Sequence, residues 1–152
     1  MATDTDDVIS TLNNLIETCK DGQNGFQTAA DGVKNGELKT LFHTYAQQRA
    51  QFSGELQSEV RRLGGDPENT GSVAASLHRG WINIKSAVTG EDEGAVIAEC
   101  ERGEDSAVRN YKDALEQNLP EKIRSIVQSQ YTQVQEAHYR IRSLERASSA
   151  GS

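Results

Sequence analysis

The segment Gln-Glu-Ala-His near the C-terminal end is the clearest candidate for metal chemistry in the chain. It places His138 three residues after Gln135. On a helix, residues three apart lie on one face, so their side chains can approach a single ion. Imidazole nitrogen is a common ligand of iron, zinc and other transition metals. The sequence therefore raises two readings of His138, as a metal ligand or as a histidine packed inside a helical protein.

Other polar residues fall at positions that match a known metal site. In di-iron four-helix bundles, two helices each supply one glutamate and two helices each supply Glu-x-x-His. The matching positions here are Gln23, Gln48, Gln51, Glu104, Gln135 and His138, with Glu101 one turn before Glu104. Of the four glutamates in that pattern one counterpart remains, and of the two histidines one remains. A neutral amide cannot offset the charge of a dication, so the pattern predicts a degenerate di-iron site.

Glu104 needs a partner in either reading, because it lies on an apolar stripe and an unpaired buried carboxylate is costly. The candidates are His138, an arginine or the glutamines, and partial exposure would also relieve the cost. A structural polar layer is the favoured interpretation. The alternative is a metal or proton site that uses Glu104, His138 and Glu101, with Gln48, Gln51 and Gln135 as further candidate ligands.

Two similar segments contain the only cysteines. Cys19 and Cys100 are each followed by a glycine three residues later. Two cysteines are too few for a disulfide scaffold, and their apolar stripes favour core packing, with a redox pair as the alternative. Gly22, Gly25 and Gly103 each cost about 1 kcal/mol inside a helix. We expect them to allow close helix approach or to make room for a large neighbour.

Helical spacing of apolar residues runs through most of the chain. Stripes with steps of three and four occur at residues 8–33, 38–63, 73–88, 97–115 and 123–144. No useful length alternates with period two, so the fold class is all-α. The sequence predicts a ferritin-like four-helix bundle of two antiparallel hairpins, with a short crossover helix between the second and third long helices. The crossover would leave those two long helices parallel.

Length and charge restrict the organisation and the partners. The 152 residues suit one domain, predicted at 1–147, with a disordered tail at 148–152. The net charge of −7 disfavours binding to nucleic acid or to an anionic membrane. Neither a signal peptide nor a membrane-spanning run is present, so we expect a cytoplasmic protein. The remaining partners are another copy of the chain or an unknown protein.

Several segments also resemble a known family. They are DGQNGFQTAAD, QQRAQFSGELQSEVRRLGG, GSVAASLHRGWINIKSAV, AECERGEDSAVRNYKDAL and QYTQVQEAHYRIRSL. From about Asp6 to Leu144 the chain resembles a bacterial family of ferritin-like four-helix-bundle proteins that is catalogued as a domain of unknown function. The resemblance implies a bundle with a crossover helix and no established reaction. Its CERGED motif makes Glu101, Arg102 and Glu104 the special positions, as a salt-bridged polar layer or a remnant site.

Three functional hypotheses follow. The first is a non-enzymatic bundle without a working di-iron site, which acts through binding or assembly and needs no cofactor. No phosphate-binding loop, nucleophile elbow or Cys-x-x-Cys pair supports catalysis. The second is a metal-binding or redox protein with a reduced site around Glu104 and His138, holding iron, manganese or zinc. The third is an oligomeric storage or stress protein.

Overall fold

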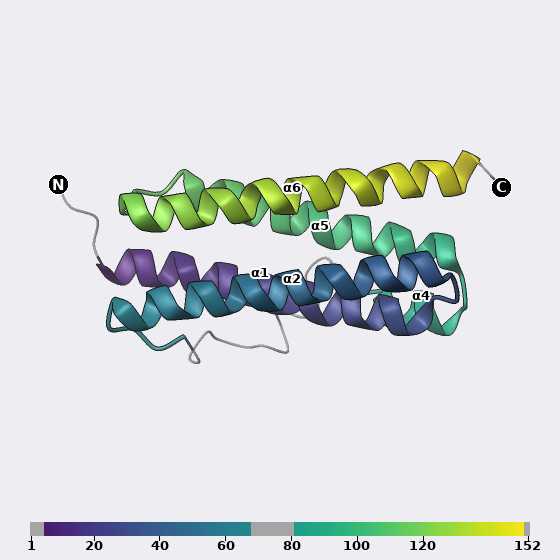
Figure 1. The fold of residues 1–152 in the computed structure, drawn as a ribbon, viewed down its shortest axis with the longest axis horizontal. Helices are drawn as coiled ribbons and strands as arrows, with labels where there is room; N and C mark the ends of the chain where they lie inside the picture. Colours follow the sequence, from purple (N-terminus) through teal and green to yellow (C-terminus); the bar gives the residue numbers. More distant parts are fainter. Residues whose placement is uncertain (1–4, 68–80, 151–152) are drawn as a thin grey trace.

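Long helices make up nearly all of the computed structural model (Figure 1), which describes residues 5–67 and 81–150 and, at 148–150, the backbone alone. The helices are α1 (Thr5–Gly32), α2 (Gly36–Arg62), α4 (Ile84–Thr89), α5 (Glu93–Leu115) and α6 (Glu121–Ala150). No strand occurs in these two ranges. The prediction of an all-α helical bundle is confirmed.

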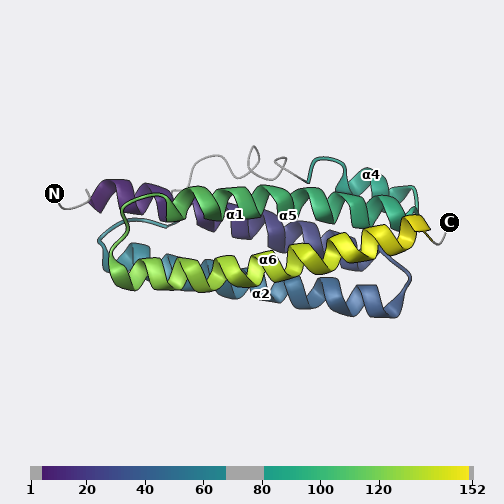
Figure 2. The ribbon, with the colours of Figure 1, turned by 90° about the horizontal axis from the view of Figure 1, so that it is seen from above.

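The four long helices pack as two hairpins. α1 packs along α2, α5 packs along α6, and α1 also contacts α5. α2 and α6 touch only sparsely, and α2 lies diagonally across the bundle from α5 (Figures 1 and 2). The colours of Figure 1 show that α2 and α5 run in the same direction, as expected for a chain that crosses the length of the bundle between them.

Local sequence signals explain where the helices begin. Asn35 caps α2, because its side-chain oxygen accepts hydrogen bonds from the backbone N–H groups of Glu37 (2.9 Å) and Leu38 (3.2 Å). Asp92 caps α5 in the same way by accepting from the N–H of Ala95 (3.1 Å). Gly36 follows the first cap directly, and Gly90 comes two residues before the second, so both helices begin where the sequence indicates a turn.

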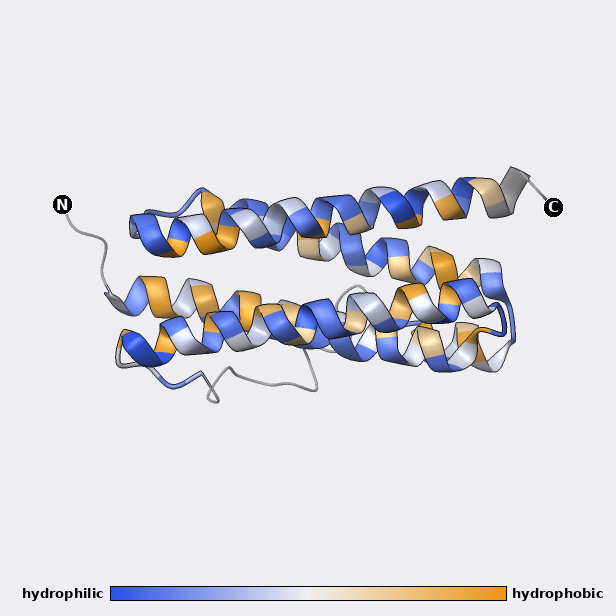
Figure 3. Cartoon of the chain, viewed as in Figure 1, coloured by the Kyte–Doolittle hydropathy of each residue, from blue (hydrophilic) through white to orange (hydrophobic). Residues whose placement is uncertain are grey.

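Apolar stripes on the facing sides of the helices form two buried clusters (Figure 3). One cluster includes Leu12, Leu15, Phe52, Leu56, Tyr111 and Val127. The other includes Phe26, Phe42, Trp81, Ile97, Cys100 and Ile141. Along α2, Arg49 lies between Ala46 of the second cluster and Phe52 of the first, and it is 1% exposed. A polar layer therefore separates two apolar halves of the core.

Trp81 attaches the crossover to the bundle. Its indole is 5% exposed and lies against Gly25 of α1 and Gly103 of α5. A methyl group on either glycine would overlap the ring, so both positions need a residue without a Cβ. The backbone N–H of Asn83 donates to a carboxylate oxygen of Glu99 on α5 (3.1 Å). The expectation that these two glycines make room for a large neighbour is confirmed.

Two predicted boundaries differ from the structure or extend beyond its description. Of the crossover helix predicted at 73–88, residues 73–80 lie outside the described residues, and the described helix α4 begins only at Ile84. α6 continues to Ala150, three residues past the predicted domain end at 147. From Glu121 to Ala150 the sequence has neither glycine nor proline, so no residue type there forces an earlier stop. Residues 151–152 of the predicted tail lie outside the described residues.

Candidate functional site

A buried ion pair occupies the middle of the bundle. Arg49 of α2 is 1% exposed and Glu104 of α5 is 0% exposed. Nη1 of Arg49 donates to Oε1 of Glu104, and Nη2 donates to Oε2 at 2.7 Å. The planar guanidinium matches both carboxylate oxygens, which makes this two-point contact stronger than a neutral hydrogen bond. The pair joins two helices that lie diagonally opposite each other.

The surroundings of Arg49 hold its side chain in place. Nε of Arg49 donates to Oε1 of Gln48 (3.2 Å), and the guanidinium carbon lies 5.4 Å from the centre of the Phe26 ring. A Cβ at Gly22 would lie 3.3 Å from the Arg49 side chain, so glycine leaves this space free. Burial alone would lower the pKa of Arg49, but the Glu104 carboxylate outweighs burial and holds that pKa above its usual value. The guanidinium is therefore charged.

A chain of hydrogen bonds beside this pair connects all four long helices. The hydroxyl of Tyr111 on α5 donates to Gln130 of α6 (2.7 Å), and Gln130 donates to the Glu55 carboxylate on α2 (2.8 Å). The Cys19 sulfur of α1 lies 3.1 Å from the same hydroxyl. Because the single hydroxyl proton of Tyr111 goes to Gln130, the Cys19 thiol is the donor in that contact. The chain leads from the core to an exposed carboxylate.

Neither cysteine is activated as a nucleophile. Burial raises the pKa of the Cys19 thiol to about 11. Burial also raises the pKa of Cys100 well above its usual value. The thiolate is the reactive form of cysteine, so both side chains are poor nucleophiles at neutral pH. Both are free thiols in different apolar clusters, which agrees with core packing.

A second cluster of ionisable groups lies between α5 and α6. Nε2 of His138 is 2.8 Å from Oδ1 of Asp105 and 3.7 Å from Oε1 of Glu101. One ligand atom from each of these three residues lies within 4.8 Å of the other two. The side chains of His138 and Glu101 are 15% and 22% exposed, and that of Asp105 is 52% exposed. This cluster opens to solvent on the Asp105 side.

The residues of the predicted metal site are divided between these two places. Glu104 binds Arg49, whereas His138 and Glu101 meet beside Asp105. Gln48 is half-buried next to Arg49, and Gln51 and Gln135 are exposed. Gln135 and His138 therefore do not point together into the interior, although they are three residues apart.

The sequence interpretation did not name two of the residues that matter most. Arg49 lies inside the Gln-Arg-Ala-Gln segment, three residues before Phe52 and four after Tyr45, and this spacing placed it on the buried stripe. A charged residue on an apolar stripe, together with Glu104 on another, is a signal for a buried pair. Asp105 carries no such signal, because acidic residues on half-exposed helix faces are common.

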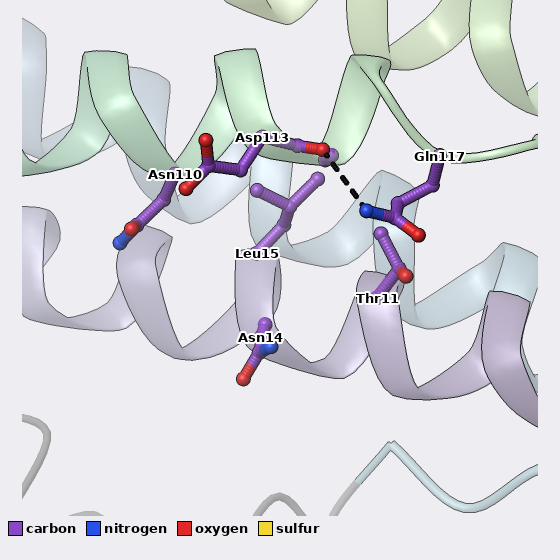
Figure 4. A pocket seen from close by; sticks show the side chains of 7 residues that line it. Thr11, Asn14, Leu15, Asn110, Asp113 and Gln117 are labelled. Atoms are coloured by element: carbon purple, nitrogen blue, oxygen red, sulfur yellow. Dashed lines mark hydrogen bonds between the residues drawn. The ribbon is translucent and has the colours of Figure 1, made fainter.

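A shallow hollow of about 160 Å³ lies between α1 and α5 (Figure 4). Thr11, Asn14 and Leu15 line it from α1, Asn110 and Asp113 line it from α5, and Gln117 lines it from the segment that follows α5. Nε2 of Gln117 lies 3.5 Å from the backbone oxygen of Asp113, a contact that holds this amide against the C-terminal end of α5. Asp113 is the one ionisable side chain in this lining, so the hollow offers little for acid–base or metal chemistry.

None of the described helices has both the length and the apolar character that crossing a membrane would require.

Comparison with known proteins places the chain in a family. A search of curated proteins finds no significant match. A family model described as "Domain of unknown function (DUF2383)" matches residues 7–117, which hold both Arg49 and Glu104. The match ends before α6, so it is shorter than the resemblance to Leu144 suggested, and it leaves out His138. Since the match covers most of the chain, the protein belongs to the DUF2383 family of domains of unknown function.

Proposed function

We propose that this protein is a non-enzymatic helical bundle of the ferritin-like type that acts through binding or assembly. The observation that carries the proposal is the Arg49–Glu104 pair in the middle of the core. In this proposal the guanidinium supplies the positive charge that metal ions supply in di-iron bundles. The proposal rests on this ion pair in the interior and on the uncharged amide and hydroxyl groups near it, which cannot offset the charge of metal ions.

The interior residues do not fit a di-iron centre. Such a centre gathers carboxylates from four helices to compensate two ions. Here Glu104 is the most deeply buried described carboxylate, and both of its oxygens already bind Arg49. A dication placed beside Glu104 would meet a fixed positive charge at short range, which is strongly unfavourable in a low-dielectric core. The nearby amide and hydroxyl groups of Gln130 and Tyr111 bring no negative charge.

Anaerobic loading with Fe²⁺ followed by exposure to oxygen tests the proposal. We expect no iron bound at Glu104 and no absorption from an oxygen-bridged iron pair. The matched variants are Glu104→Gln and Glu116→Gln, where Glu116 is exposed at the end of α5. Far-UV circular dichroism checks that each variant is folded. A pair of ions per chain that disappears in Glu104→Gln and persists in Glu116→Gln would overturn the proposal.

The assembly part of the proposal needs its own measurement. Light scattering coupled to size exclusion gives the mass of the particle over a range of concentrations. A stable oligomer supports assembly, and with it the storage or stress alternative. A monomer at every concentration leaves binding to another protein as the proposed action and removes assembly.

A further inference from the structure

We propose that Glu101, Asp105 and His138 form a binding site for one divalent transition-metal ion between α5 and α6. The site is separate from the Arg49–Glu104 pair and does not depend on the proposed function. It uses a different ligand set from the one that the sequence pattern indicates, because Asp105 replaces Glu104 and the glutamines take no part.

The geometry of the cluster fits a metal ion. Glu101 and Asp105 are four residues apart on α5, so their carboxylates lie on one face of the helix. Nε2 of His138 on α6 lies 3.7 Å from Oε1 of Glu101 and 2.8 Å from Oδ1 of Asp105. Metal–ligand bonds of about 2.1 Å put neighbouring ligand atoms of an octahedral ion about 3 Å apart and opposite ones about 4.2 Å apart. The three ligand atoms lie within 4.8 Å of one another, so only small side-chain shifts would bring them to these separations.

The charges around the cluster favour a dication. Among residues 5–67 and 81–147, neither Glu101 nor Asp105 forms an ion pair with a lysine or arginine, and His138 is the group they share. By contrast, the two buried carboxylates of α5 each have a basic partner, since Glu104 binds Arg49 and Glu99 binds Arg102. Two carboxylates with one imidazole between them leave a net negative charge that an ion would balance.

The position of Nε2 of His138 is a second observation that supports a metal site. This atom is out of contact with solvent and makes no hydrogen bond, although it lies 2.8 Å from Asp105. The lone pair of a neutral imidazole that faces two carboxylates would be repelled by them. Either a proton or a metal ion must therefore occupy the space between Nε2 and the oxygens. These two occupants give opposite results in a binding experiment.

The ligand types indicate which ions would bind. One imidazole with two carboxylates suits Zn²⁺, Mn²⁺, Fe²⁺ and Co²⁺, whereas Mg²⁺ and Ca²⁺ prefer oxygen ligands alone. With three protein ligands and a half-exposed Asp105, water or an external ligand can fill the remaining positions. A metal ion at this site would therefore keep coordination positions that the protein does not fill.

Isothermal titration of the full chain with Zn²⁺, on protein purified without a histidine tag, tests this site. The test variants are His138→Gln and Asp105→Asn. The matched controls are His43→Gln on α2 and Asp113→Asn on α5. We expect wild type and both controls to bind one ion per chain, and each test variant to bind at least about tenfold more weakly. Co²⁺ provides a second readout, because its visible absorption reports nitrogen ligation and should be lost in His138→Gln.

Two outcomes would overturn the inference. If wild type shows no saturable Zn²⁺ binding, a proton fills the space and the cluster is an ion pair only, which leaves the proposed function intact. If an ion binds but is lost in Glu104→Gln and retained in Asp105→Asn, the metal lies in the interior and the proposed function fails as well. Loss in Asp105→Asn with retention in Glu104→Gln supports the site and leaves the interior proposal standing. Because Asp105 is half-exposed, its variant should keep the fold, and the unchanged unfolding temperature without metal verifies this.

Discussion

At the scale of single residues, the Arg49–Glu104 pair is the feature on which the core most depends. Removing one partner leaves the other charge buried without compensation. We expect Glu104→Gln to lower the free energy of unfolding by about 3–5 kcal/mol. Replacing both with apolar residues, as in Arg49→Met with Glu104→Leu, should restore most of that loss, because a well-packed apolar pair avoids the desolvation cost.

Urea unfolding of Arg49→Met, Glu104→Leu and the double variant measures this coupling. The control is Glu91→Gln, because the side chains of the Lys34–Glu91 pair are 84% and 70% exposed. Loss of this pair should change the free energy of unfolding by an amount near the detection limit. A double variant that is as unstable as the sum of the two single variants would contradict the interpretation of Arg49 and Glu104 as one unit.

Glycine positions provide a second test at this scale. Gly103→Ala would force a methyl group into the Trp81 indole, and we expect it to lower the free energy of unfolding by about 1–3 kcal/mol. Gly54→Ala is the matched control, because nothing lies within 4 Å of a Cβ there. That control should stabilise the protein by about 0.5–1 kcal/mol through its higher helix propensity.

Trp81 is the only tryptophan in the sequence, so its fluorescence reports the same substitution. Its emission should shift to longer wavelength in Gly103→Ala and stay unchanged in Gly54→Ala. Equal effects of the two substitutions on stability and emission would show that the indole does not depend on Gly103.

The buried Cys19 thiol predicts a loss of stability at high pH. Its pKa rises from 9.0 to about 11 in the folded protein, so above pH 9 the unfolded chain binds fewer protons than the folded one. The free energy of unfolding should therefore be constant with pH below about 9 and fall as pH rises toward 11. The upper bound on the Cys19 contribution is about 3 kcal/mol.

Urea unfolding at intervals from pH 7 to pH 11 measures this effect, with Cys19→Ala as the comparison. Cys100 and Tyr111 also have pKa values raised by burial, so the variant should retain part of the slope. Identical pH profiles for the two proteins would mean that Cys19 titrates in the folded state as it does in the unfolded chain.

At the scale of the elements, α6 is the long helix that packs least extensively against other helices. It packs mainly on α5, whereas α1 contacts α2, α4 and α5. Regions with fewer packed partners open at lower free energy. We expect the slowest amides of α6 to exchange with deuterium at least about tenfold faster than the slowest amides of α1, a difference of about 1.4 kcal/mol. Mass spectrometry of peptides from the two helices measures the rates, and equal protection would indicate that the bundle opens as one unit.

Sequence reasoning identified the helices because their apolar spacing is a local property. The stripes and the Lys34-Asn35-Gly36 turn follow from neighbouring residues alone, and they match α1 and α2. The partner of Glu104 cannot be predicted from local spacing. Spacing shows that Arg49 and Glu104 both face inward, but it does not show that α2 and α5 lie diagonally opposite at the same height. For the same reason the meeting of His138 with Asp105 required the structure.

At the scale of the whole molecule, the family and the candidate sites cover different parts of the chain. The DUF2383 match includes α2, α5 and all of α1 except its first two residues, and with them the complete Arg49–Glu104 pair. Gln130 and His138 come from α6, beyond the match. The interior pair is therefore complete within the matched region, whereas the proposed metal site needs a residue outside it. Neither the fold nor a family of unknown function identifies an activity, so function has to be tested at these sites.

The ion pair across the diagonal also limits how the two hairpins can slide along each other. Apolar stripes repeat every turn, so sliding one hairpin by a turn, about 5.4 Å, would still bring apolar side chains into contact. The same movement would separate Arg49 from Glu104 and bury both charges against side chains that cannot compensate them. The pair thus selects one axial alignment among several that hydrophobic contact alone would accept, as a single polar residue does in the seam of a coiled coil.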